Sequence, residues 1–335
     1  MAPRSGDFQV SESLVPGFQP AVVADDSGNF LVVWQSAGQQ MDGSHVLGRR
    51  FDSSGLPLAG EFQIDTATSD GIRSHARVGR GVDGTFLVAW RADNVAETTR
   101  IEARQLSPSG EPMGDPFQVT SPRSVAGDYY LSPPAVAATG QGFVVLWSSG
   151  FRRNEYFDNN IVSQVYGRRV VDGAPVGVDF LASTLTEPDV VTQNEIDVAT
   201  MPDGFVVAWA AGEVFSFDSD FEVRARVFDA EANPLGTELV VGQEGMRGPE
   251  VAADTAGRFM VAWATDRLVD YPIPSHVLAR TFEPDGSPAG PEFEVSTPGD
   301  DASFYQRTDA GSYGLDVAVA DDAFVVVWSS GYPYE

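Results

Sequence analysis

The sequence predicts an all-β fold, specifically a six-bladed β-propeller, from three observations. A five-residue phrase that begins with Phe and ends with Trp occurs six times, at intervals of 54 to 65 residues. Gly and Pro are concentrated between the apolar phrases, and no long stretch has helical spacing. A repeat of this length, with several short strands in each copy, is typical of sheets arranged radially. The phrases end at the six tryptophans of the chain, Trp34, Trp90, Trp147, Trp209, Trp263 and Trp328.

Each repeat contains four strand-like segments. The first is short and rich in Val and Ala, as in residues 21–24, and a turn of Asp and Gly connects it to the tryptophan phrase. The tryptophan phrase is apolar at every position, which predicts burial on both faces between neighbouring sheets. The third segment carries Arg after Gly or Ala, as in 46–51, and the fourth follows a Gly-containing turn, as in 61–64.

The two ends of the chain indicate how the array closes. Residues 7–10 match the fourth segment of a repeat with no other segment before them, whereas residues 315–328 supply only a first and a second segment. We therefore expect a single propeller domain over residues 1–335 whose last blade is completed by the N-terminal strand. That last blade is incomplete because it lacks a third segment, so seven blades in a longer parent chain are an alternative. An elongated solenoid is less favoured, because it would gain nothing from the split repeat.

The phrase Gly28–Trp34 has the pattern G-x-F-x-V-x-W. In this pattern the chain resembles bacterial secreted and cell-surface β-propeller repeat proteins, over residues 7–328. The resemblance implies a propeller architecture and a location outside the cell. It implies no activity.

Composition narrows the classes of function. The chain has no cysteine, which excludes disulfides and thiolate metal sites. Its net charge of -27 opposes binding to nucleic acid and to anionic membranes, and no apolar run is long enough to cross a bilayer. We expect an acidic, monomeric protein at the cell surface or outside the cell, exported by a signal segment that this chain does not contain.

Five arginines recur at one position of the third segment, which favours a structural role over a ring of anion-binding sites. A planar guanidinium can satisfy carbonyls between neighbouring sheets. The Gly or Ala before each Arg is expected to make room for an indole of the adjacent tryptophan phrase. The arginines are Arg49, Arg104, Arg168, Arg226 and Arg280.

No metal site or other cofactor is predicted. The Asp-rich turns, of which 25–28 is the richest, leave calcium binding open as an alternative to a purely structural turn, although none has the spacing of a known calcium loop. The three histidines, His45, His75 and His276, show no paired spacing typical of a metal site.

The candidate ligand-binding site lies on the long connectors after the second and fourth segments, which should emerge on one face of the propeller. These loops carry aromatic side chains beside carboxylates and arginines, a combination suited to sugar or peptide recognition. The alternative is that the aromatics only fasten the loops to the scaffold. The predicted site residues are Asp128, Tyr129, Tyr130, Arg153, Tyr156, Asp158, Phe217, Asp218, Tyr271 and Tyr305.

These features favour a recognition module that binds a glycan or an extracellular protein through the long-loop face. The first alternative is a propeller glycoside hydrolase or polysaccharide lyase, which needs two carboxylates about 5–10 Å apart or a carboxylate beside His75. The second alternative is a structural repeat region of a larger surface protein. The candidate carboxylates for the enzymatic alternative are Asp128, Glu155, Asp158, Asp218 and Asp220 in the loops and Asp197, Glu250 and Asp316 at the start of the first segments.

Overall fold

The chain is all-β in the part that the structure describes. A computed structural model describes residues 7–12, 16–37, 43–66, 71–93, 99–121, 129–152, 161–184, 192–212, 221–243, 247–265, 276–296, 315–320 and 323–328. These ranges contain strands and turns and no helix. Accordingly, none of them supplies a helix that could cross a membrane.

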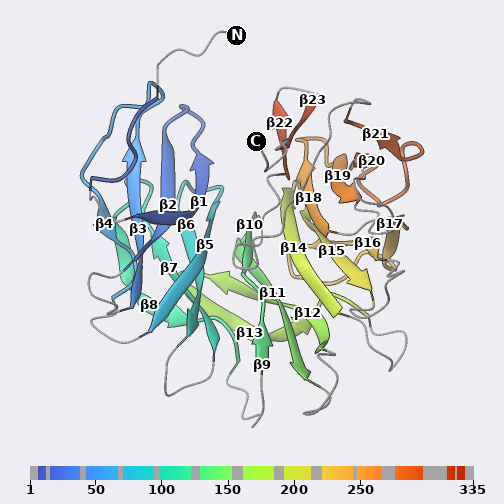
Figure 1. Ribbon diagram of the computed structural model, residues 1–335, viewed down its shortest axis with the longest axis horizontal. Coiled ribbons are helices and arrows are strands. Elements are labelled where there is room, and N and C mark those ends of the chain that lie inside the picture. Colours follow the sequence, from blue (N-terminus) through green and yellow to red (C-terminus); the bar gives the residue numbers. More distant parts are fainter. Residues whose placement is uncertain are drawn as a thin grey trace, which may run out of the picture. The chain divides into compact units, whose positions relative to one another are not determined.

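Successive repeats form successive antiparallel sheets, in which strands joined by hairpins lie side by side in chain order (Figure 1). Four repeats form sheets of four strands, the third sheet has one additional strand that pairs with β11, and the last sheet has two strands. This arrangement confirms the four-segment reading of the repeat. The strands of the first three sheets are β1 (Gly17–Ala24), β2 (Phe30–Ala37), β3 (Ser44–Phe51) and β4 (Phe62–Gln63); β5 (Ile72–Arg80), β6 (Phe86–Asp93), β7 (Arg100–Leu106) and β8 (Pro112–Gln118); and β9 (Tyr129–Leu131), β10 (Ala135–Thr139), β11 (Gly142–Arg152), β12 (Ile161–Val171) and β13 (Ala174–Leu181). Those of the remaining sheets are β14 (Thr192–Met201), β15 (Gly204–Gly212), β16 (Glu222–Asp229) and β17 (Leu239–Gly242); β18 (Arg247–Ala253), β19 (Phe259–Thr265), β20 (His276–Phe282) and β21 (Phe293–Glu294); and β22 (Leu315–Ala320) and β23 (Ala323–Trp328).

The chain divides into two compact units. The first consists of Met1–Arg123, Pro133–Val145 and Arg168–Asp179, and the second of Ser124–Ser132, Leu146–Gly167 and Phe180–Glu335. The first two sheets therefore belong to the first unit. The last three belong to the second unit, and the third sheet contributes residues to both.

The tryptophan strands of the first five sheets are buried on both faces, as their sequence predicts, whereas in β23 exposed residues alternate with half-buried ones. In the first unit, Leu31 and Val33 of β2 share a core with Trp90 of β6, while Val32 and Trp34 of the same strand belong to a different core. The second unit repeats the pattern. There Val261 and Trp263 of β19 share a core with Val206 and Ala208 of β15, while Ala262, which lies between them in the sequence, belongs to a core with residues of β22. Alternate side chains of one strand thus face two neighbouring sheets.

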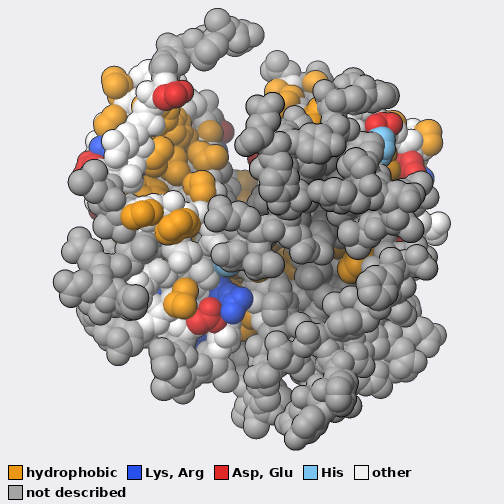
Figure 2. All heavy atoms as spheres, in the orientation of Figure 1, with side chains coloured by type: hydrophobic (Ala, Val, Ile, Leu, Met, Phe, Trp, Pro, Cys, Tyr) orange, Lys and Arg blue, Asp and Glu red, His pale blue; other side chains and the backbone are white. Residues whose placement is uncertain are grey.

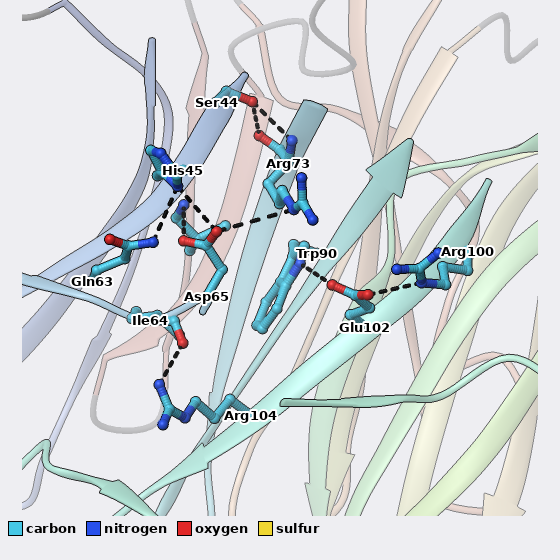
Figure 3. Close-up of polar contacts among 11 residues, drawn as sticks. Ser44, His45, Gln63, Ile64, Asp65, Arg73, Trp90, Arg100, Glu102 and Arg104 are labelled. Carbon is cyan, nitrogen blue, oxygen red and sulfur yellow. Dashed lines mark hydrogen bonds and ion pairs between the residues drawn. The ribbon is translucent and has the colours of Figure 1, made fainter. Parts of the chain in front are cut away.

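The recurring arginines are structural, as predicted. In each compact unit they donate hydrogen bonds from Nη1 to a carbonyl at the end of the preceding repeat, and Figure 3 shows the one from Arg104 to Ile64. The same guanidinium also binds a carbonyl in the turn of its own sheet, for example that of Gly236 for Arg226. The five Nη1–O distances are 3.0 Å for Arg49–Val10, 2.8 Å for Arg104–Ile64, 2.9 Å for Arg168–Val119, 3.2 Å for Arg226–Ala182 and 3.2 Å for Arg280–Val241.

The N-terminal segment occupies the position of a fourth strand relative to the first sheet. The Phe8 ring lies 5.3 Å from that of Phe51 and 6.3 Å from that of Phe30, measured between ring centroids. Phe180 of β13 has the same relation to the equivalent pair, with its ring 5.7 Å from that of Phe228 in β16 and 6.4 Å from that of Phe205 in β15. Within the described residues, β23 pairs only with β22, so completion of the last blade by residues 7–10 stays a prediction.

The expected role of the small residue before each arginine is wrong. A Cβ atom added at Gly48 would lie 2.9 Å from the side chain of Ile64 and 3.2 Å from the ring of Phe62, which follow it in the same repeat. A Cβ atom at Gly167 would meet the ring of Phe180. The small residue makes room for the side chains of the fourth strand rather than for an indole, because the fourth strand pairs directly with the third.

Candidate active site

Most of the predicted loop site lies outside the described residues. This applies to Asp128, Arg153, Tyr156, Asp158, Phe217, Asp218, Tyr271 and Tyr305, and equally to the candidate acids Glu155 and Asp220. Only the backbone of Tyr129 and Tyr130 is described, in β9, where these two residues pair with Phe151 and Gly150 of β11. The loop-face hypothesis therefore stays a prediction.

The structure does bring together the three candidate carboxylates of the first strands, all in the second compact unit. Asp197 of β14 pairs with Ala208, Glu250 of β18 with Ala262, and Asp316 of β22 with Val327. Each partner directly precedes a tryptophan, so the three acids occupy one register position of three successive repeats. β18 packs between β14 and β22, which gives a row of three carboxylates on neighbouring strands.

Asp197 and Glu250 form a directly interacting pair. A hydrogen bond joins their side chains, and the Asp197 carboxylate also accepts a 2.8 Å hydrogen bond from the amide of Val251. Burial raises the pKa of Asp197 to about 6, the negative charge of Asp316 acts in the same direction, and the hydrogen bonds oppose the shift. The pair therefore keeps a proton in mildly acidic solution, where an ordinary carboxyl has lost it. Asp316 is exposed to solvent.

A repeated β-bulge positions these acids. Glu195 has a φ of 53° and Gly248 a φ of 63°, and each lies where the strand pairing shifts, two residues before Asp197 or Glu250. Glu195 accepts a 2.6 Å hydrogen bond from the amide of Gly248, so the bulge of one strand holds the bulge of the next. Bulges of this kind re-aim the side chains that follow them.

The same device recurs in the first unit with different chemistry. Gln19 and His75 have φ values of 52° and 56°, and Gln19 accepts a 2.8 Å hydrogen bond from the amide of His75. Two residues after His75, the register position of the acids is occupied by Arg77. Burial, together with the positive charges of Arg77 and Arg91, lowers the pKa of His75 to about 4 against the opposing charge of Asp93. His75 is therefore neutral at pH 7.

Sequence reasoning did not find these bulges. Gln19, His75 and Glu195 adopt a left-handed backbone that usually marks Gly or Asn, and only Gly248 carries that signal. The side chains of Gln19 and Glu195 stabilise this backbone by accepting hydrogen bonds from the amides of the bulge in the next repeat. A hydrogen bond between repeats has no local sequence pattern.

The aspartates of the acidic turns accept hydrogen bonds from backbone amides of their own turns. The Asp25 carboxylate accepts 2.9 Å hydrogen bonds from the amides of Ser27 and Asn29, and Asp254 holds Ala256 and Arg258 in the same way. The side-chain hydrogen bond from Asn29 is the largest influence on Asp25, and the pKa of this carboxyl lies below its usual value. Among the described residues, no group of three or more His, Asp or Glu side chains could hold a metal ion.

The two histidines at equivalent positions, His45 and His276, bind carboxylates of their own repeats. His45 Nδ1 lies 3.1 Å from Asp65, and His276 Nδ1 lies 2.6 Å from Glu294. Figure 3 shows His45 between Asp65 and Gln63. These contacts connect the third and fourth segments of a repeat, which gives both histidines a structural role.

Comparison with known proteins identifies the fold. No protein-family model and no curated protein sequence matches the chain. Among solved structures, the chain is similar to the GH93 α-L-arabinofuranosidase of Fusarium graminearum in complex with arabinobiose, with a TM-score of 0.56, 12% identity, and coverage of 90% of this chain and 84% of that one. The same enzyme with an iminosugar inhibitor has a TM-score of 0.58 and 12% identity, with coverage of 92% of this chain and 85% of that one. An α-L-arabinanase of Penicillium chrysogenum with arabinobiose has a TM-score of 0.54 and 14% identity, with coverage of 96% of each chain.

These likenesses show that the chain has the β-propeller fold of four-stranded blades. The number of blades stays a prediction. The similar structures are glycoside hydrolases, so the fold is one that also accommodates glycan-cleaving enzymes.

Proposed function

We propose that the protein is a glycoside hydrolase whose chemistry is carried out by Asp197, Glu250 and Asp316. The observation that carries the proposal is the hydrogen-bonded Asp197–Glu250 pair with its raised pKa, in register with a third carboxylate. The propeller hydrolases with a similar fold support it. The enzymatic alternative from the sequence is thus favoured over a module that only binds.

The pair and the third acid have different roles. Asp197 and Glu250 are too close to act as separate groups on the two sides of a sugar ring, because hydrolysis needs carboxyl groups about 5–10 Å apart. We assign the pair as one general acid, which delivers its proton to the glycosidic oxygen as the bond to the anomeric carbon breaks. Asp316, exposed to solvent, is then the second group, which activates the attacking water or forms the glycosyl intermediate.

The finer assignments are also proposals. A glycan is the expected partner, and arabinose-containing oligosaccharides are the first substrates to test because two of the similar structures hold arabinobiose. The net charge of -27 is consistent with a monomer outside the cell that avoids nucleic acid.

The experiment is a cleavage assay of the full chain on arabinan-derived oligosaccharides and a panel of aryl glycosides. Asp197→Asn, Glu250→Gln and Asp316→Asn should each lower kcat by about 10²-fold or more, the usual contribution of a positioned acid or base. Asp203→Asn changes an exposed turn residue of the same sheet and should leave cleavage unchanged. Glycan binding without cleavage by the wild-type protein would contradict the proposal and favour the recognition module.

A further inference from the structure

The Gln19–His75 contact fixes which nitrogen of His75 carries the proton. Gln19 Oε1 accepts the His75 amide proton, so the other end of the Gln19 carboxamide must be the amino group, and it lies 2.9 Å from His75 Nε2. An amino group can only donate, so Nε2 accepts. Because the ring is neutral, its proton is on Nδ1.

This arrangement leaves a buried hydrogen-bond donor with no acceptor. His75 Nδ1 is buried and has no hydrogen-bond partner in the described part of the chain. A buried polar group without a partner costs about 1–3 kcal/mol, so such groups often indicate a bound molecule. The missing partner must accept a hydrogen bond.

Arg77 gives the same site a positive charge. Among the described residues its guanidinium makes one hydrogen bond, of 3.1 Å from Nη1 to the carbonyl of Ala76, and no carboxylate lies within ion-pair distance. The nearby Arg91 is already bound to Asp93, at 3.1 Å from Nε to Oδ2. Arg104, Arg226 and Arg280 have no carboxylate partner of this kind either, but each of them binds two carbonyls, whereas Arg77 binds one.

From these observations we infer that Arg77 and His75, oriented by Gln19, form a subsite for the carboxylate of a uronic acid residue in a glycan. One carboxylate oxygen accepts the Nδ1 proton of His75, and the guanidinium of Arg77 neutralises its charge. The inference rests on the proposed function for the glycan, and it specifies an acidic glycan. Figure 2 shows basic side chains gathered beside acidic ones near β5, the strand that carries His75 and Arg77.

The test is a calorimetric titration of the full chain carrying Asp197→Asn, which separates binding from cleavage. The probes are a trimer of galacturonic acid, a neutral galactose trimer of the same length, and acetate alone. We expect the acidic trimer to bind about tenfold or more tightly than the neutral one, as one charge-assisted contact allows. Arg77→Gln should remove most of this preference. His75→Asn should reduce the preference for the acidic trimer, and asparagine tolerates the left-handed backbone at this position.

Arg80→Gln is the matched control, since Arg80 lies on the same strand and forms an ion pair with Asp26, which is almost fully exposed. It should retain the preference. Equal affinity for the two trimers, an equal loss in Arg80→Gln, or acetate binding as tightly as the acidic trimer would overturn the inference. Binding of the acidic trimer by a protein that cleaves no glycan would leave this subsite intact and remove only the proposed hydrolysis.

Discussion

The guanidinium of Arg49 donates a 3.0 Å hydrogen bond to the carbonyl of Val10, across a separation of 39 residues. The contact reproduces the one that every other recurring arginine makes with the end of the preceding repeat. Residues 7–10 therefore take, by their contacts, the position that the fourth strand of the preceding repeat takes next to the other sheets. This relation supports the split repeat that the sequence predicts.

The arginine contacts should contribute measurably to stability. Arg226→Met keeps the length of the side chain but leaves the Ala182 and Gly236 carbonyls without their donor. We expect a loss of about 1–3 kcal/mol in the free energy of unfolding, measured by denaturant titration. Arg258→Met removes an ion pair whose arginine is half-exposed and should cost no more than about 1 kcal/mol. Equal costs for the two variants would contradict the structural role.

The N-terminal segment should stabilise the first sheet. Phe8→Ala removes a ring that packs on Phe30 and Phe51, and because Phe8 is 46% exposed we expect a loss of about 1–2 kcal/mol. Phe18→Ala, at a residue 50% exposed on β1, is the control and should change stability by about 0.5 kcal/mol or less. Similar losses in both would indicate that the segment does not dock.

Closure of the ring can be tested by a distance, because the chain has no cysteine and two engineered ones are unique labelling sites. If residues 7–10 complete the last blade, which lacks a third segment, they lie one or two strand positions from 323–328. Spin labels at Gln9 and Ala323 should then be about 5–10 Å apart at the backbone, once or twice the spacing between neighbouring strands. A distance several times larger would contradict closure.

The raised pKa of Asp197 should make stability depend on pH. In the unfolded chain this carboxyl loses its proton near pH 4, whereas in the native protein it holds the proton to about pH 6. Rising pH between these values therefore favours unfolding. Asp197→Asn removes the effect and should stabilise the protein at pH 7 by up to about 3 kcal/mol. At pH 4 the variant and the wild type should be equally stable, and a constant difference across the range would contradict the shift.

The repeat, the strand order and the burial of the tryptophan strands could be predicted because each follows from a short pattern copied several times. Phe30–Trp34, apolar at every position, can only be accommodated between two sheets. The bulges at Gln19, His75 and Glu195 could not be predicted, because contacts between neighbouring repeats hold them.

The candidate site was only partly accessible from sequence. The sequence places Asp197, Glu250 and Asp316 at equivalent positions of three repeats. It does not distinguish them from the five candidate acids in the loops, because the distances between side chains are not known from sequence. The contact between Asp197 and Glu250 separates these two from the others, because burial and a shared hydrogen bond depend on the packing of β14 on β18.

The dependence of kcat/KM on pH tests the proposed catalytic pair most directly. If the Asp197–Glu250 pair is the general acid, kcat/KM for glycoside cleavage should fall as pH rises through about 6 and be about a hundredfold lower at pH 8 than on its acidic plateau. A rate that stays constant from pH 5 to pH 8, or the same pH dependence in Asp197→Asn, would contradict the assignment.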